Sequence, residues 1–137
     1  LPYLFGRDLH GARKLPAVQF ADESWKLSHV HSLPHIPDYI YACRPGDKLE
    51  FTFDGSILGL YYTVEKDSGI LEYSIDGSDW KSVDLWDEYA LLFGRAHFLM
   101  IEELLPKGEH SVTLKISHQK AEKSEGYYAR IGAFCVG

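Results

Sequence analysis

Apolar and polar residues alternate with a period of two in several stretches of the chain after residue 47. In KLEFTF (48–53), Leu49, Phe51 and Phe53 lie on one face of an extended chain, and polar residues lie on the other. The next stretch, ILGLYYTV (57–64), is apolar on both faces. We expect the first to be a half-buried strand and the second to be a central strand that is covered on both sides.

A hairpin signal follows these two strands. GILEYSI (69–75) alternates again and runs into Asp76-Gly77, and Gly tolerates the positive φ that a tight turn requires. The returning strand is DWKSVDL (79–85). Three more stretches have strand character, separated by short polar loops: 97–104, 110–117 and 127–136.

Two segments break this rhythm. Residues 1–47 hold five of the six prolines and no long periodic run, so we expect an irregular, extended arm with short strands near 25–30 and 39–43. Residues 84–96 lack a clean period of two, although Leu85, Tyr89 and Leu92 have roughly helical spacing. This segment is predicted to be a long crossing loop with one helical turn.

Together these elements predict an all-β fold, an antiparallel β-sandwich. At 137 residues the chain is expected to form a single domain, with residues 1–47 as the arm and 48–137 as the main strands. The formal net charge of −6 argues against nucleic-acid or anionic-membrane partners, and no apolar stretch has the length of a membrane span. The chain starts at Leu1 without a signal-like segment, so we expect an excised piece or a mature product.

Catalytic motifs are missing from the sequence. There is no G-x-S-x-G, no HExxH and no CxxC, no histidine has an aspartate three residues before it, and the only Gly-Asp, Gly46-Asp47, is followed by lysine. We therefore do not expect this chain to be an enzyme by itself.

Histidines are dense in HVHSLPH (29–35), which places His29, His31 and His35 within seven residues. On a strand His29 and His31 would share one face, as two metal ligands must. The flanking residues depart from the cupin pattern, because Glu23 stands where a glycine is expected and His35 where a glutamate is expected. The interpretation we favour is a histidine-rich surface loop, and a three-histidine metal site is the alternative.

Four motifs carry a family resemblance over most of the chain. FDGSILGL (53–60) precedes the GILEYSIDG hairpin (69–77), LPKGEHSV (105–112) follows, and SEGYYARI (124–131) begins the last strand. An early FGR (5–7) fits the same pattern. The sequence resembles the β-sandwich accessory domain of SGNH (GDSL-type) esterases.

This resemblance implies a galactose-binding-domain-like jelly roll without chemistry of its own. In that family the catalytic serine and histidine belong to a separate SGNH domain, and none of those motifs is present here. The resemblance also implies an attached SGNH hydrolase domain as partner, carbohydrate as a possible ligand, and a secreted or cell-envelope bacterial carbohydrate esterase as parent protein. No cofactor is expected; a structural calcium ion, common in such folds, would lack a D-x-D-x-D loop here.

The crossing loop holds the candidate ligand-binding residues, since loops at a sandwich end often carry function. An aromatic platform beside charged groups suits a sugar, whose apolar face stacks while its hydroxyls form hydrogen bonds. The candidates in or beside this loop are Trp86, Asp87, Tyr89, Arg95 and His97. The alternative is that the loop closes the sandwich with its rings turned inward.

Other residues have a structural interpretation first. Trp25 in the arm is a further ligand candidate, as a stacking ring or a lid. Trp80 is expected to pack across the hairpin. The core is expected to hold Tyr61, Tyr62 and Tyr73, and turns are expected to hold Asp54, Asp76 and Asp79.

The remaining charged and thiol groups leave alternatives open. Arg130 is expected to be a paired arginine rather than a ligand contact. Cys43 and Cys135 are either two separate thiols or a disulfide that joins the chain ends, and their spacing does not decide between these.

The sequence thus leads to three hypotheses. The first is a non-catalytic accessory domain that binds or positions a carbohydrate for an attached hydrolase. The second is a purely structural module that docks on the catalytic domain. The third is a small metalloenzyme built on His29, His31 and His35.

Overall fold

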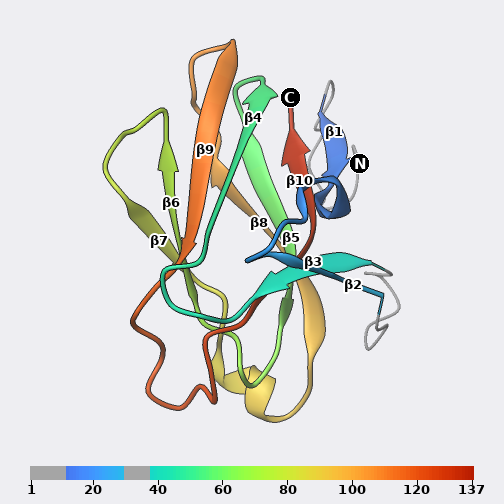
Figure 1. The fold of residues 1–137 in the computed structure, drawn as a ribbon, viewed down its shortest axis with the longest axis vertical. Helices are drawn as coiled ribbons and strands as arrows, with labels where there is room; N and C mark the ends of the chain where they lie inside the picture. Colours follow the sequence, from blue (N-terminus) through green and yellow to red (C-terminus); the bar gives the residue numbers. More distant parts are fainter. Residues whose placement is uncertain (1–11, 30–37) are drawn as a thin grey trace.

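The computed structural model describes residues 12–29 and 38–137 and shows two antiparallel sheets packed face to face, with almost no helix (Figure 1). The elements are β1 (Arg13–Pro16), η1 (Ala17–Phe20), β2 (Lys26–Ser28), β3 (Tyr39–Ala42), β4 (Lys48–Asp54), β5 (Leu58–Val64), β6 (Ile70–Ile75), β7 (Lys81–Asp84), η2 (Glu88–Leu91), β8 (Arg95–Glu102), β9 (Glu109–Ile116) and β10 (Ala129–Val136). The prediction of an antiparallel β-sandwich is confirmed.

The two sheets differ in size. The larger has six strands in the order β2-β3-β10-β5-β8, with β1 also paired to β10, and the smaller has four in the order β4-β9-β6-β7. Strands β7 and β8 are therefore the edge strands that follow one another along the chain, joined by the segment that contains η2. From β3 to β10 every connection except the β6–β7 hairpin crosses from one sheet to the other, which places the connecting loops at the two ends of the sandwich.

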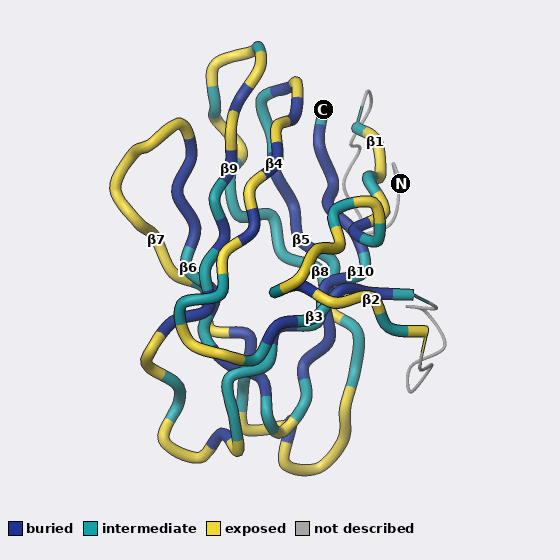
Figure 2. The backbone as a smooth tube through the Cα atoms, viewed as in Figure 1, coloured by how far each residue is buried: buried dark blue, intermediate teal, exposed yellow. Residues whose placement is uncertain are grey.

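The core lies between the sheets, where the alternating side chains meet (Figure 2). In β4 the predicted face, Leu49, Phe51 and Phe53, is buried while its polar neighbours are exposed. Every residue of β5 is buried except Tyr61, as expected of a central strand. Phe51 and Phe134 bring the sheets together with ring centroids 4.5 Å apart.

The hairpin between β6 and β7 turns where the sequence predicted. Asp76 and Gly77 both have positive φ, 53° and 74°, and the Ser78 N–H donates to the Ile75 carbonyl. Trp80, which was expected to pack across this hairpin, is 43% exposed, and the Lys115 ammonium of β9 lies 4.2 Å from its ring centroid.

The arm is more regular than expected. It supplies β1, β2 and β3 to the larger sheet, and β1 pairs with β10 from Arg13↔Val136 to Pro16↔Ala133. The strands near 25–30 and 39–43 are confirmed, whereas β1 was not predicted.

Arg130 fastens one end of the sandwich. Its guanidinium donates two hydrogen bonds to the Asp67 carboxylate, at 2.8 and 3.1 Å, lies 3.3 Å from Glu65 and stacks over the Tyr128 ring at 4.2 Å. The prediction of a paired arginine is confirmed. The pair ties the β5–β6 turn to β10.

Both cysteines are free thiols. Cys135 is buried in β10 and Cys43 is half-buried after β3. The alternative of a disulfide between the chain ends is therefore wrong for this structure.

Candidate functional site

The segment between β7 and β8 is anchored by two small contacts with the core. Leu85 and Ala90 are 1% and 2% exposed, and the backbone N–H of Trp86 donates to the Asp84 carboxylate at 3.0 Å. Between these anchors the chain forms the short 3₁₀ helix η2, which confirms the predicted loop with one helical turn. Leu85 and Ala90 thus anchor the segment in the core, and Trp86 packs against it, while residues 91–93 are exposed.

An ion pair closes the segment. Arg95, the first residue of β8, donates two hydrogen bonds to Asp87, one of them at 3.1 Å from Nη1 to Oδ1. These bonds hold the pKa of Asp87 below its usual value and raise the pKa of Arg95. The sequence named both residues, and the structure brings them together as partners.

Exposed apolar side chains gather on top of the segment. Tyr89 is 57% exposed, Leu91 46%, Leu92 79% and Phe93 54%. The Arg95 guanidinium lies 5.9 Å from the centroid of the Phe93 ring, so the apolar group borders the ion pair. We call Tyr89, Leu91, Leu92 and Phe93, together with Asp87 and Arg95, the η2 loop site.

His97 lies beside this site on the edge strand β8. It is exposed and meets the Tyr62 ring edge to face, with centroids 5.6 Å apart. Burial of Tyr62 raises the pKa of its phenol to about 12, so this ring stays neutral and supports His97 from within. The structure therefore places Asp87, Tyr89, Arg95 and His97 in one region.

The two remaining tryptophan candidates do not belong to this surface. Trp25 is completely buried, with its backbone N–H bonded to Asp22, so it presents no ring to a ligand and its prediction as a stacking residue or lid is corrected. Trp86 is half-buried and packs against the core. Among the described residues, the indole N–H groups of these two tryptophans alone are buried side-chain donors without a partner.

Sequence reasoning missed the outward direction of Leu91, Leu92 and Phe93. The signal was the run LLF directly before Gly94, which reads equally well as a plug for the sandwich end. A depression of about 130 Å³ lies between this run and the β5–β6 turn, bordered by Glu65 and Lys66. It is too shallow to enclose a ligand, so the site works as a surface.

The histidine-rich stretch is only partly described. The His29 ring nitrogen Nδ1 lies 2.8 Å from Asp38 Oδ1, while His31 and His35 lie outside the described residues. Within 12–29 and 38–137 no group of three or more His, Cys, Asp or Glu side chains is arranged to hold a metal ion. The same ranges contain no helix long and apolar enough to cross a membrane.

No family model and no curated protein sequence matches the chain. Solved structures do match. A two-domain esterase (CEX) active on acetylated mannans, co-crystallised with mannopentaose, aligns with a TM-score of 0.66 and 12% identity over 92% of this chain and 36% of its own. A family two carbohydrate esterase from Cellvibrio japonicus aligns with a TM-score of 0.57 and 13% identity, over 91% of this chain and 33% of its own.

A third solved structure, of a single domain, aligns with this chain over almost its full length. The CBM36-1 domain of a multidomain xylanase from the hindgut metagenome of Trinervitermes trinervoides aligns with a TM-score of 0.56 and 9% identity over 92% of this chain and 96% of its own. The chain thus spans about a third of the esterases and nearly all of that domain. At these identities the comparisons establish the fold: an antiparallel β-sandwich shared with domains of carbohydrate esterases and of a xylanase.

Proposed function

We propose that this chain is a non-catalytic accessory domain of a larger carbohydrate-active hydrolase, and that the η2 loop site binds or positions a carbohydrate. The observation that carries the proposal is the exposed Tyr89 and Phe93 beside the Asp87–Arg95 ion pair at one sandwich end. An exposed ring offers the apolar face of a sugar a stacking surface, and the charged pair offers its hydroxyls both acceptors and donors. An arginine and a carboxylate that hold each other need no reorganisation when the ligand arrives.

The attached catalytic domain is the second part of the proposal. The esterases that share this fold are about three times as long as the aligned region, and the sequence motifs resemble those of SGNH-esterase accessory domains. We infer an SGNH-type hydrolase as the neighbouring domain, on a secreted or cell-envelope protein. The absence of nucleophile motifs from the sequence supports a non-catalytic role for this chain.

A glycan-binding titration tests the proposal. The panel contains mannopentaose, acetylated mannan and xylan, chosen from the polymers named for proteins of similar fold. Tyr89→Ala is the test variant. Leu27→Ala is the control, because it removes an exposed apolar side chain from β2, at the opposite edge of the larger sheet from β8.

The size of the effect follows from the exposed area of Tyr89. A tyrosine side chain has about 150–250 Å² to bury, and 57% of Tyr89 is exposed. If a sugar covers half of that area, the lost contact is worth about 1–2 kcal/mol. We expect Tyr89→Ala to raise Kd roughly 5- to 30-fold and Leu27→Ala to leave it unchanged. Equal affinity of both variants, or no binding to any glycan, would contradict the proposal.

One observation favours a second function. Leu91 and Leu92 are 46% and 79% exposed, and aliphatic side chains suit a protein partner better than a sugar. On this alternative the η2 loop site docks on the catalytic domain. Leu91→Ser with Leu92→Ser would then lower the melting temperature of the full protein but not that of this chain alone, and would not alter glycan affinity.

A further inference from the structure

A concave site lies at the opposite end of the sandwich from η2 (Figure 1). The β6–β7 turn and the β8–β9 loop come together there, at the top of Figure 1, and enclose a pocket of about 340 Å³. This volume is at the lower end of the range for small-molecule sites, about 300–1,000 Å³. We call it the hairpin pocket; its lining comes from the hairpin, from the end of β8, from the β8–β9 loop and from the start of β9.

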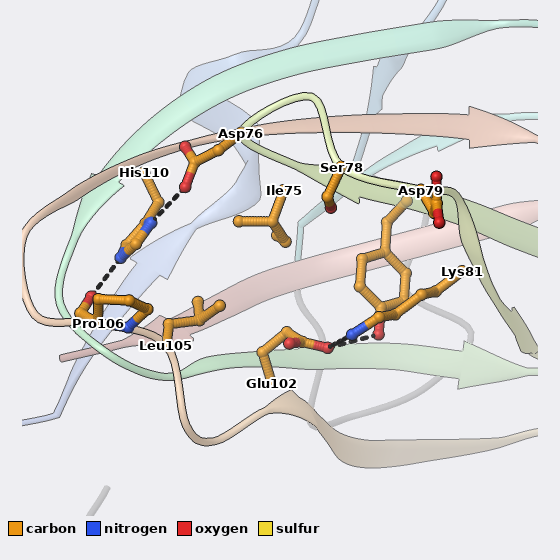
Figure 3. Close-up of a pocket in the computed structure, with 10 residues that line it drawn as sticks. Ile75, Asp76, Ser78, Asp79, Lys81, Glu102, Leu105, Pro106 and His110 are labelled. Atoms are coloured by element: carbon orange, nitrogen blue, oxygen red, sulfur yellow. Dashed lines mark hydrogen bonds and ion pairs between the residues drawn. The ribbon is translucent and has the colours of Figure 1, made fainter.

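One part of the lining is apolar and the other is charged (Figure 3). Ile75, Leu105 and Pro106 supply the apolar part, beside the Asp76–His110 pair, while Lys81 and Glu102 lie together at the other end of the pocket. A ligand that fits must therefore present an apolar surface to one side and hydrogen-bonding groups to the other.

The charged part is ordered before any ligand arrives. Glu102 Oε2 accepts from the Lys81 ammonium at 2.9 Å and from the Tyr73 hydroxyl at 3.0 Å. Both bonds end on the same oxygen, which leaves Oε1 to accept from a ligand. The ammonium has three N–H groups and uses one of them here, so it has others to donate.

The opposite wall is fixed by an imidazole. His110 Nδ1 lies 2.6 Å from Asp76 Oδ2, and Nε2 faces the Pro106 carbonyl oxygen. This bridge ties the hairpin turn to the β8–β9 loop and so keeps both walls of the pocket at a constant separation. Asp79, exposed on the rim, adds a further carboxylate.

The lining excludes several ligand classes. An anion would meet the carboxylates of Asp76, Asp79 and Glu102, and the one lysine is already paired with Glu102. An apolar molecule would strip water from the charged end without replacing its hydrogen bonds. A bound metal ion is disfavoured because the described acidic side chains do not converge in a group of three. A neutral ring with one apolar face and a hydroxyl-bearing edge fits both parts.

We propose that the hairpin pocket is a second binding site, separate from the η2 loop site, which takes one neutral sugar ring. The ring's apolar face packs on Ile75 and Leu105, and its hydroxyls bond to Lys81, Glu102 Oε1 and Asp79. The proposal stands on the lining of this pocket and does not depend on the function proposed for the η2 loop site.

Amide chemical-shift mapping tests it with defined probes. Methyl mannoside, methyl galactoside and methyl xyloside are titrated to tens of millimolar, followed by mannopentaose. We expect shifts confined to the hairpin and the β8–β9 loop with at least one methyl glycoside. A glycan chain is the source of the ring if mannopentaose binds more tightly than the methyl glycoside, and a free sugar is the source if it does not.

Variants keep the result specific. Lys81→Met removes an ammonium donor and Asp79→Ala removes an exposed carboxylate; Lys48→Met, on the exposed face of β4, is the control. We expect Lys81→Met to weaken binding roughly ten-fold or more, Asp79→Ala to weaken it less, and the control to bind as the wild type does. If the loss of Lys81 disturbs the fold, the Asp79 variant still tests whether the pocket lining contributes to sugar affinity.

Three results would overturn the proposal. They are the absence of any shift with every probe, shifts confined to the η2 loop site, and hairpin shifts that survive both variants unchanged. Shifts confined to the η2 loop site would contradict the hairpin pocket as a binding site but agree with the function proposed for the η2 loop site. The experiment therefore tests the two proposals separately.

Discussion

Loss of one proton from His110 is predicted to destabilise the fold. Its two ring nitrogens face Asp76 Oδ2 and the Pro106 carbonyl, and both are acceptors. A neutral imidazole has only one N–H, whereas the imidazolium satisfies both acceptors. The bond to Asp76, followed by the bond to Pro106, raises the pKa of His110, and the bond from His110 lowers the pKa of Asp76. The folded protein therefore holds a charged histidine where the unfolded chain would release its proton.

The sign and the slope follow from linkage. An unfolded histidine has a pKa of about 6.5, and the pKa of His110 in the folded state is higher. Its stabilising contribution is complete below about pH 6.5 and is lost as the pH rises through the folded pKa. In that window the folded state holds one more proton than the unfolded state, so the free energy of unfolding falls by up to about 1.4 kcal/mol per pH unit. The His110 side chain is 7% exposed but that of its partner Asp76 is 50% exposed, so solvent screens part of this pair and the measured slope should lie below that limit.

Urea unfolding between pH 5.5 and 9 measures this slope. The wild type is compared with His110→Gln, and with His118→Gln as a control that removes an exposed imidazole. The advantage of the wild type over His110→Gln should shrink as the pH rises, while His118→Gln should run parallel to the wild type. Parallel curves for the wild type and His110→Gln above pH 6.5 would refute the reasoning. A ¹⁵N titration of the wild-type ring gives the same pKa without any substitution.

Three further predictions concern stability and thiol chemistry. Arg130→Met leaves the Asp67 carboxylate without its two hydrogen bonds, and should cost about 2–3 kcal/mol in urea unfolding, less than a fully buried pair because Asp67 is 31% exposed. Gly59→Ala would place a Cβ 2.5 Å from the Phe98 ring, and should cost about 1–3 kcal/mol by overpacking; an unchanged melting temperature would mean that the ring swings aside freely. Burial raises the pKa of the Cys135 thiol, so it should react with a thiol reagent only after unfolding; rapid labelling of the native protein would contradict this.

Strand alternation and turn chemistry were readable from the sequence because both are local. The alternation of Leu49, Phe51 and Phe53 fixes the register of β4, since a shift by one residue would expose all three apolar side chains. The turn at Asp76-Gly77 is equally local, because two positive φ angles in succession are costly for most residue types.

The missed elements depend on distant partners. Strand β1, RKLP, has no alternation and ends in proline, and it is a strand only because β10 pairs with it more than a hundred residues later. Trp25 reads as an exposed arm residue until the two sheets close over it. No property of either segment alone carries that information.

The residue types of the candidate site could be predicted from the sequence, but not which of its side chains would be exposed. Asp87 and Arg95 stand eight residues apart, and their pairing requires η2 to bring the loop back over the start of β8. Leu91, Leu92 and Phe93 are exposed, while Leu85 and Ala90 of the same segment are buried in the core. A hydrophobic run in a loop therefore does not report which way it points.

The two ends of the sandwich are built differently, and this bears on what each can bind. The η2 loop site is an open platform of exposed side chains with only a shallow depression of about 130 Å³, so substitutions there change surface contacts without removing core packing. The hairpin pocket is concave, and its walls are held by the His110 bridge and by the Lys81–Glu102–Tyr73 bonds. A platform suits an extended surface such as a polymer or a neighbouring domain, whereas a pocket of about 340 Å³ suits a single ring. Because edge strands β7 and β8 run between the two ends, a glycan chain that occupied both would have to follow that edge, where Ser82, Asp84 and His97 are exposed polar residues.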